Sequence, residues 1–249
     1  MDILSTISSS TFIFAALAAF ILGISKSGLK GFGFVIVSLM AVAYGSRAST
    51  GILLPLLILA DIFAVVAYRK DVDWKTLLKI LPPMIVGVVI GSYIGDYISV
   101  ELFRYVLAGI ILLGGVMMIV VLKMPKDKIP NNQWFANVMG LGAGITTMIG
   151  NLAGAFANLY FLALRFSKEA FIGTAAYIFF IINIFKLPFH IFGWKTITAD
   201  TIAINLTLAP FVIVGFFVGY QIVKYISNQF FQRYIIFMTI LSAVLILLA

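Results

Sequence analysis

The chain has 249 residues, of which 63% are hydrophobic and only 10% are charged, and its formal net charge is +8. This composition excludes a soluble globular domain, because successive apolar runs are long enough to cross about 30 Å of hydrocarbon. The absence of cysteine and the single histidine exclude a disulfide framework and most histidine-based metal sites. The basic residues lie mainly in short loops, so we attribute the positive charge to membrane topology and not to nucleic-acid binding.

The apolar runs predict ten helices, five in each half of the chain. In the first half they cover residues 11–25, 31–45, 49–69, 79–99 and 104–122. In the second half they cover residues 134–149, 152–165, 170–190, 203–223 and 231–248. We therefore expect two transmembrane units, residues 1–122 and 134–249, joined by a cytoplasmic linker of residues 123–133.

The two halves of the chain repeat each other. Asp61, followed by Ile-Phe, is matched 122 residues later by Asn183, also followed by Ile-Phe. The Pro-Gly-Gly pattern of residues 82–91 returns at residues 210–219, shifted by 128. Two copies of one helical bundle that move about a shared site are typical of secondary transporters. The expected fold is an all-α polytopic membrane protein built from two homologous repeats.

The distribution of basic residues favours inverted repeats. An odd number of crossings in each half would collect the basic clusters of residues 69–79, 123–128 and 165–168 on one side of the membrane. The positive-inside rule makes that side cytoplasmic and puts both termini outside. Parallel repeats are the alternative, and they would weaken this charge bias. Each repeat is expected to contain a glycine-broken helix pair followed by three spanning helices.

Each half begins with two short helices separated by a glycine-rich break, at residues 23–33 and 140–154. Pieces of about 15 residues are shorter than the roughly 20 residues that a membrane span requires. Broken helices occur inside a bilayer where the backbone is buried in protein or lines a wet cavity. We expect both breaks to be re-entrant or short paired helices that meet near the middle of the membrane.

The two breaks contain the candidates for an anion-binding site. Lys26 and Lys30 lie between apolar flanks, where a lysine usually serves a site or pairs with an acid. The start of the helix after the break would add backbone N–H donors. The alternative is that both lysines extend from a shallow loop to the interface. The predicted substrate-binding residues are Ser25, Lys26, Ser27, Gly28, Lys30, Gly31, Thr146, Thr147, Gly150, Asn151 and Asn158.

Asp61 lies near the middle of a predicted spanning helix, where an acidic residue is functional by default. It either carries a coupling proton or is the fixed counter-ion of a site lysine. A structural Asp–Lys pair without a role in transport is the third interpretation. The matched residue Asn183 cannot titrate, and the second break is neutral, so the charge of the site is predicted to belong to the first half alone.

Other polar and small residues are expected to have structural roles. Lys186 falls near the end of the helix at 170–190 and is predicted to extend to the interface without a site role. His190 is predicted to be an interface residue, with a proton relay as the alternative. Glycines spaced by four within residues 87–95 and 215–219 favour close helix packing within the chain. A sliding surface and a homodimer contact are alternatives for these glycine faces.

A glycine-rich break, an apolar helix and the motif of residues 48–51, Ala-Ser-Thr-Gly, follow one another in the first half. Together with Asp71-Val72-Asp73-Trp74 and the Pro82/Gly87/Gly91 helix, this order resembles the sulfite exporter TauE/SafE family over nearly the whole chain. The resemblance implies export of sulfur-containing anions, such as sulfite and sulfonates, across the bacterial inner membrane. Lys26 and Lys30 stand where mostly small residues are expected, which fits an anionic substrate.

The predicted function is a secondary transporter that exports small sulfur-containing anions by alternating access, with protons as the candidate coupling ion. An anion channel and a transporter of another small organic anion are the alternatives. An intramembrane enzyme is not expected, because the sequence offers no cysteine, one histidine and no clustered intramembrane carboxylates. The expected partners are the anion, the lipid bilayer and protons, and no cofactor, metal or nucleic acid is expected.

Overall fold

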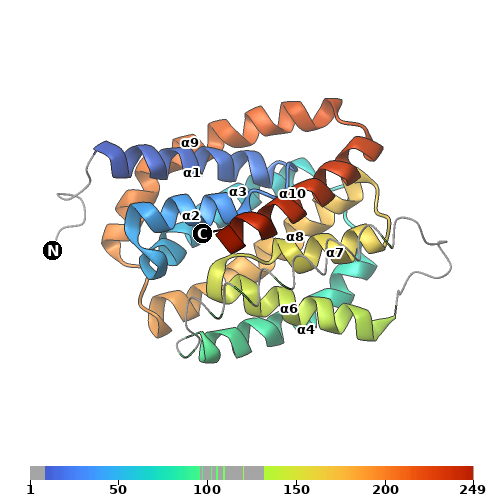
Figure 1. The fold of residues 1–249 in the computed structure, drawn as a ribbon, viewed down its shortest axis with the longest axis horizontal. Helices are drawn as coiled ribbons and strands as arrows, with labels where there is room; N and C mark the ends of the chain where they lie inside the picture. The colour runs from blue at the N-terminus through green and yellow to red at the C-terminus, as the bar shows by residue number, and fades with distance from the viewer. Residues whose placement is uncertain are drawn as a thin grey trace.

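The computed structural model describes residues 9–95 and 132–248, together with residues 97, 102, 105, 109 and 120. All regular elements in this described part of the chain are helices. Most of them run along the long axis of the molecule (Figure 1). Most of the predicted helix at 104–122 and most of the predicted linker lie outside the described residues.

Nine α-helices and one π-helix are described. The first half contains α1 (Ser9–Lys26), α2 (Gly33–Tyr44), α3 (Ser46–Ala67) and α4 (Trp74–Ile94). The second half contains α6 (Gln133–Gly150), α7 (Gly154–Ala163), α8 (Lys168–Pro188), the π-helix η3 (Phe189–Gly193), α9 (Ala199–Tyr225) and α10 (Asn228–Leu248). Every bound of these α-helices lies within five residues of the predicted one, so the helical pattern of the described part is confirmed.

Two helices begin earlier than predicted because their starts have good caps. Asp73 accepts the backbone N–H of Thr76 at 2.8 Å, so α4 begins five residues before the predicted start. Thr198 and Thr201 form a reciprocal capping box, which begins α9 four residues early. Such caps satisfy N–H groups that have no partner inside the helix, and apolar periodicity does not report them.

Four helices in the described part are long and apolar enough to cross a membrane: Arg47–Ala67, Trp74–Ile94, Lys168–Gly193 and Ala199–Tyr225. Helices α2 and α7, with 12 and 10 residues, are too short to span, as predicted for broken pairs. Many large apolar side chains are exposed on the outer surface, among them Val42, Val66, Leu78, Phe192 and Leu206. A lipid environment accounts for this exposure, and the fold is that of a multi-pass membrane protein.

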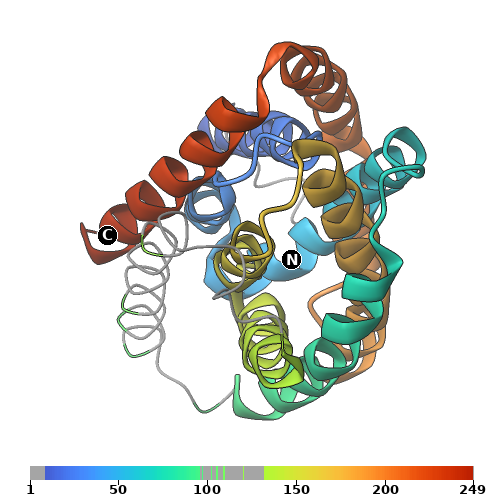
Figure 2. The ribbon, with the colours of Figure 1, turned by 90° about the vertical axis from the view of Figure 1, so that its right-hand side faces the viewer.

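Helices from the two halves of the chain pack against each other in pairs. Helix α1 packs along α9, and α6 packs along α4, while α3 and α8 contact each other between these pairs. Figure 1 shows α1 and α9 at the upper edge and α4 and α6 at the lower edge, and the end view of Figure 2 agrees. The first α-helix of each half therefore packs against the fourth α-helix of the other half.

Glycines allow these two close crossings. A Cβ atom on Gly87 or on Gly144 would clash with the backbone of the facing helix, at Leu141 and Met84 respectively. At the other crossing, a Cβ atom on Gly215 would clash with the backbone of Phe20. The predicted packing role of the glycine faces is confirmed within the single chain.

Candidate anion-binding site

Both predicted helix breaks are present in the structure. Helix α1 ends at Lys26, and Gly28 and Gly31 then adopt φ values of 135° and 109°, which residues with a Cβ atom rarely take. Helix α6 ends at Gly150, and Asn151 follows in the left-handed conformation with φ 56°. Asparagine tolerates this conformation better than most residues, so the sequence itself stops the helix here.

The two breaks meet at one cavity of about 120 Å³. Apolar side chains of α1, α2, α3 and α8 form much of its wall. Predicted site residues from both halves contribute the polar part: Ser25, Lys26, Lys30, Gly31, Thr147, Asn151, Asn158 and Asn183. The starts of α2 and α7, at Gly33 and Gly154, also line the cavity.

The remaining predicted residues of the breaks have local contacts outside the cavity wall. The Ser27 hydroxyl donates to the Ile24 carbonyl at 2.8 Å, and the Thr146 hydroxyl donates to the Gly142 carbonyl at 2.8 Å. Gly28 packs against Ile172, and Gly150 is the last residue of α6. These residues shape the breaks and do not line the cavity.

Asp61 lies at the junction of the two halves and is completely buried. Its Oδ1 atom is 2.6 Å from the Nζ atom of Lys26, and its Oδ2 atom accepts a hydrogen bond from Asn183 at 2.7 Å. Both carboxylate oxygens therefore have a donor. The geometry is that of a counter-ion for Lys26, one of the three interpretations open to the sequence.

Lys30 projects into the same cavity without such a partner. It is only 6% exposed, and within the described residues its ammonium contacts neither a carboxylate nor another hydrogen-bond acceptor. Its Nζ atom lies 5.6 Å from the centre of the Phe179 ring, and that of Lys26 lies 5.0 Å from it. Both lysines are buried in protein, so their alternative placement at the interface is wrong.

Lys186 is the residue that sequence reasoning missed. It was expected at the interface, but it is 0% exposed, and its ammonium donates to the Oδ1 atom of Asn151 and lies 3.5 Å from the Thr147 hydroxyl. The physical reason is that the helical segment continues to Gly193, which places Lys186 two turns inside its end. The useful signal was its spacing from Asn183, since residues three apart share a helix face.

This contact also corrects the predicted distribution of charge. The second half supplies Lys186 to the wall region of the site, so the charge does not belong to the first half alone. Helices α2 and α7 begin 121 residues apart, and at this spacing Lys26 and Lys30 correspond to Thr147 and Asn151. The two lysines of the first half thus correspond in sequence position to two neutral residues of the second half.

His190 also differs from its prediction as an interface residue. It is completely buried in η3, where its Nδ1 atom lies 2.8 Å from the Thr196 hydroxyl and its ring packs against Trp194. The continuation of α8 into η3 explains this burial as well. Among the described residues its Nε2 atom has no hydrogen-bond partner.

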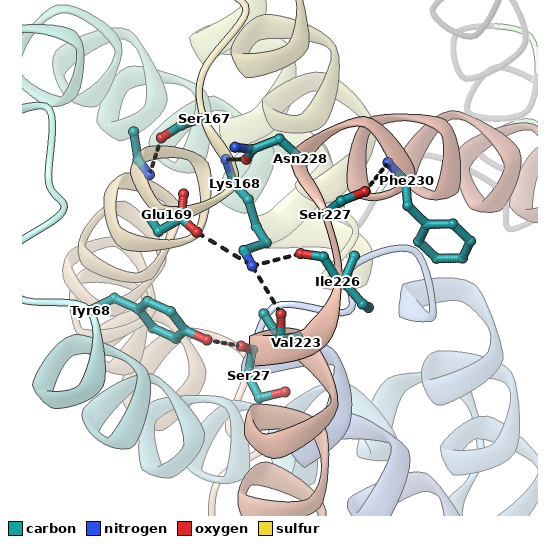
Figure 3. Close-up of polar contacts among 11 residues, drawn as sticks. Ser27, Tyr68, Ser167, Lys168, Glu169, Val223, Ile226, Ser227, Asn228 and Phe230 are labelled. Atoms are coloured by element: carbon teal, nitrogen blue, oxygen red, sulfur yellow. Dashed lines mark hydrogen bonds and ion pairs between the residues drawn. The ribbon is translucent and has the colours of Figure 1, made fainter.

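A second polar cluster lies where α8, α9 and α10 meet (Figure 3). The ammonium of Lys168 donates to the carbonyls of Val223 at 3.0 Å and Ile226 at 2.8 Å, which are left open at the end of α9. Its backbone N–H donates to the side chain of Asn228 at 2.7 Å. Figure 3 also shows the Tyr68 hydroxyl donating to the carbonyl of Ser27, at 2.7 Å. These contacts fix helix ends and the first break.

The cavity has the donor groups of an anion site. It combines lysine ammonium groups with hydroxyl and amide side chains, and it lies where two helices begin. Neither α2 nor α7 has a side-chain hydrogen bond at its N-cap, so their first N–H groups remain available to an acceptor. In the part of the chain that the structure describes, no group of three acidic, histidine or cysteine residues is placed to hold a metal ion.

A bundle of apolar spanning helices around a cavity that places lysine, hydroxyl and amide side chains in a mainly apolar wall is typical of a membrane transporter. The sequence profile of the family described as Sulfite exporter TauE/SafE matches residues 14–246, and the chain belongs to this family. The resemblance predicted from the motifs is thereby confirmed. No curated protein sequence and no solved structure matches the chain significantly.

Proposed function

We propose that this protein exports small sulfur-containing anions, such as sulfite or a sulfonate, and binds them in the cavity between the two breaks. Family membership supports the class of substrate. The observation that carries the site is Lys30, a buried ammonium that lines the cavity and has no acceptor within the described residues. A bound anion would stabilise the protonated form of this buried lysine.

The proposed site joins Lys30 to neutral donors from both halves. Thr147, Asn151 and Asn158 from the second half and Ser25 from the first half line the same cavity. The open N–H groups at the starts of α2 and α7 would complete the binding of an oxyanion, because helix N-termini favour negative charge. Ser27, Gly28, Thr146 and Gly150 are assigned to shaping the breaks.

We assign Asp61 and Lys26 to coupling between the halves. In the structure, the carboxylate of Asp61 on α3 forms an ion pair with Lys26, and Asn183 on α8 donates a hydrogen bond to the same carboxylate. Opening of this pair during the transport cycle would release a carboxylate, and that carboxylate is the candidate carrier of a coupling proton. The proposal therefore contains both roles that the sequence left open for Asp61.

The pairing of helices from opposite halves supports alternating access by two inverted repeats. Helix pairs α1–α9 and α4–α6 occupy equivalent places, and α3 and α8 carry the matched residues Asp61 and Asn183 to one contact. Rocking of one helix bundle against the other about this contact would open the cavity first to one side and then to the other. We place the protein in the bacterial inner membrane, with residues 1–122 and 134–249 as the repeats and 123–133 as a cytoplasmic linker.

Proteoliposome flux tests the proposed function. Protein reconstituted into liposomes should transport radiolabelled sulfite, and Lys30→Gln should reduce the flux strongly. Lys224→Gln is the matched control, because Lys224 is an exposed lysine that contacts Gln221 and Tyr220 at the end of α9. Equal flux through the two variants would contradict the assigned site, and currents far above carrier turnover rates would favour the channel alternative.

A further inference from the structure

Among the described residues at the cavity, lysines outnumber carboxylates. Among the described residues, Asp61 is the carboxylate that contacts a lysine of the site, and it is paired with Lys26 at 2.6 Å. Its second oxygen accepts the hydrogen bond from Asn183. The Lys26–Asp61 pair therefore adds no net charge to the site, and it leaves the charge of any further protonated lysine to a bound anion.

Lys30 supplies the first uncompensated charge. It lines the cavity directly and is 6% exposed, so bulk solvent cannot screen it well. The aromatic face of Phe179 lies 5.6 Å from its ammonium and provides only a partial negative potential.

Lys186 supplies the second uncompensated charge. Its ammonium donates to neutral oxygens of Asn151 and Thr147, and within the described part of the chain it has no carboxylate partner. Asn151 and Thr147 both line the cavity, so Lys186 lies directly behind the wall. In an interior of low dielectric, a charge at this position acts on a bound ion and polarises the intervening amide toward it.

We propose that Lys30 and Lys186 together make this site selective for small anions that carry two negative charges. The inference rests on the proposed function and specifies its substrate, for which doubly ionised sulfite is one example. A singly charged anion would compensate one of the two lysines, whereas a doubly charged anion compensates both. The cavity of about 120 Å³ is well above the roughly 10–15 Å³ that one water molecule requires, so it has room for a small oxyanion.

Competition between two anions of nearly equal shape tests the proposal in the wild-type protein. Sulfate carries two charges, while methanesulfonate replaces one oxygen by a methyl group and carries one. At constant ionic strength, sulfate should inhibit uptake of labelled sulfite at concentrations about tenfold or more below those of methanesulfonate. Equal inhibition by the two anions would overturn the proposal and leave the proposed function intact. Absence of both sulfite uptake and anion inhibition would overturn the proposed function itself.

Removal of either lysine should reduce the preference for two charges. In Lys186→Gln or Lys30→Gln, we expect the inhibition constant of sulfate to rise about tenfold or more, while that of methanesulfonate changes much less. The control variant Lys224→Gln removes the same charge at an exposed position near the end of α9 and should keep the wild-type ratio. An unchanged ratio in well-folded Lys186→Gln would contradict the role of Lys186. If Lys186→Gln does not fold, Lys30→Gln and the wild-type ratio still decide the charge preference.

Discussion

Asn183 donates a hydrogen bond of 2.7 Å from its Nδ2 atom to the Oδ2 atom of Asp61, so two residues matched in the internal repeat contact each other. One belongs to α8 and the other to α3, and both are buried. Asp61 carries the negative charge of this contact, and Asn183 supplies only a dipole. The two residues matched in the sequence therefore make one contact with different chemistry, and the charged member of the pair also holds Lys26.

Breaking the Lys26–Asp61 pair from one side should destabilise the protein. Asp61→Asn leaves Lys26 buried without its counter-ion, and loss of one partner of a buried pair typically costs about 3–5 kcal/mol. The double variant Asp61→Asn with Lys26→Gln removes both charges and should recover most of this loss. Thermal unfolding in detergent measures both effects, and a double variant as unstable as Asp61→Asn would contradict the paired assignment.

The same variants separate the two roles of Asp61 in transport. If Asp61 carries the coupling proton, sulfite flux through the stable double variant should no longer depend on the proton gradient. If Asp61 is only a counter-ion, the flux should keep the wild-type dependence. Flux is measured with and without an imposed pH difference across the liposome membrane, and a retained dependence removes Asp61 from the coupling role.

The helix crossing at Gly144 should reject any side chain. A Cβ atom there would clash with the backbone of Met84 in α4, and overpacking of this kind costs about 1–3 kcal/mol or more. Gly144→Ala should therefore lower the melting temperature clearly. Gly193→Ala is the matched control, since no atom lies within 4 Å of the added Cβ position. Similar melting temperatures for the two variants would contradict the close crossing of α4 and α6.

Lys168 should contribute stability and leave anion selectivity unchanged. Its ammonium satisfies two carbonyls at the end of α9, and hydrogen bonds to charged groups contribute about 1.5–3 kcal/mol. Lys168→Met should lower the melting temperature, whereas Lys224→Met at an exposed position should have little effect. The ratio of sulfate to methanesulfonate inhibition should stay at the wild-type value, and a shift of that ratio would indicate a role for Lys168 in the anion site.

Tyr68 should stabilise the first break through its hydroxyl group. This hydroxyl donates to the buried carbonyl of Ser27, and an unsatisfied buried acceptor costs about 1–3 kcal/mol. Tyr68→Phe should therefore lower the melting temperature, while Tyr225→Phe, at a residue that is 88% exposed, serves as the control. Hydrogen exchange of the backbone around Ser27 should increase in Tyr68→Phe, and unchanged exchange would contradict this role.

The helices and the breaks were largely predictable, because apolar length and clustered glycines report backbone structure directly. The starts of α4 and α9 were placed late, since their caps at Asp73 and Thr198 lie in polar sequence before the apolar run. Most of the predicted helix at 104–122 falls outside the described residues. At α4 and α9 the prediction failed because side-chain hydrogen bonds extend each helix beyond its apolar pattern.

The site was predictable in part. Lys26, Lys30 and Asp61 were identified because charges within apolar runs need a partner or a ligand, and the structure brings them together. Lys186 and His190 were missed, since the helix was predicted to end at residue 190, whereas its continuation into η3 extends to Gly193 and both residues are buried.

The position of a bound anion tests the central claim most directly. A structure of the protein with selenite, the selenium analogue of sulfite, would locate the anion by its anomalous scattering. We expect the anomalous peak in the cavity between the breaks, next to Lys30 and within reach of Asn151 and Asn158. A selenite ion bound outside this cavity, in a protein that transports sulfite, would contradict the account.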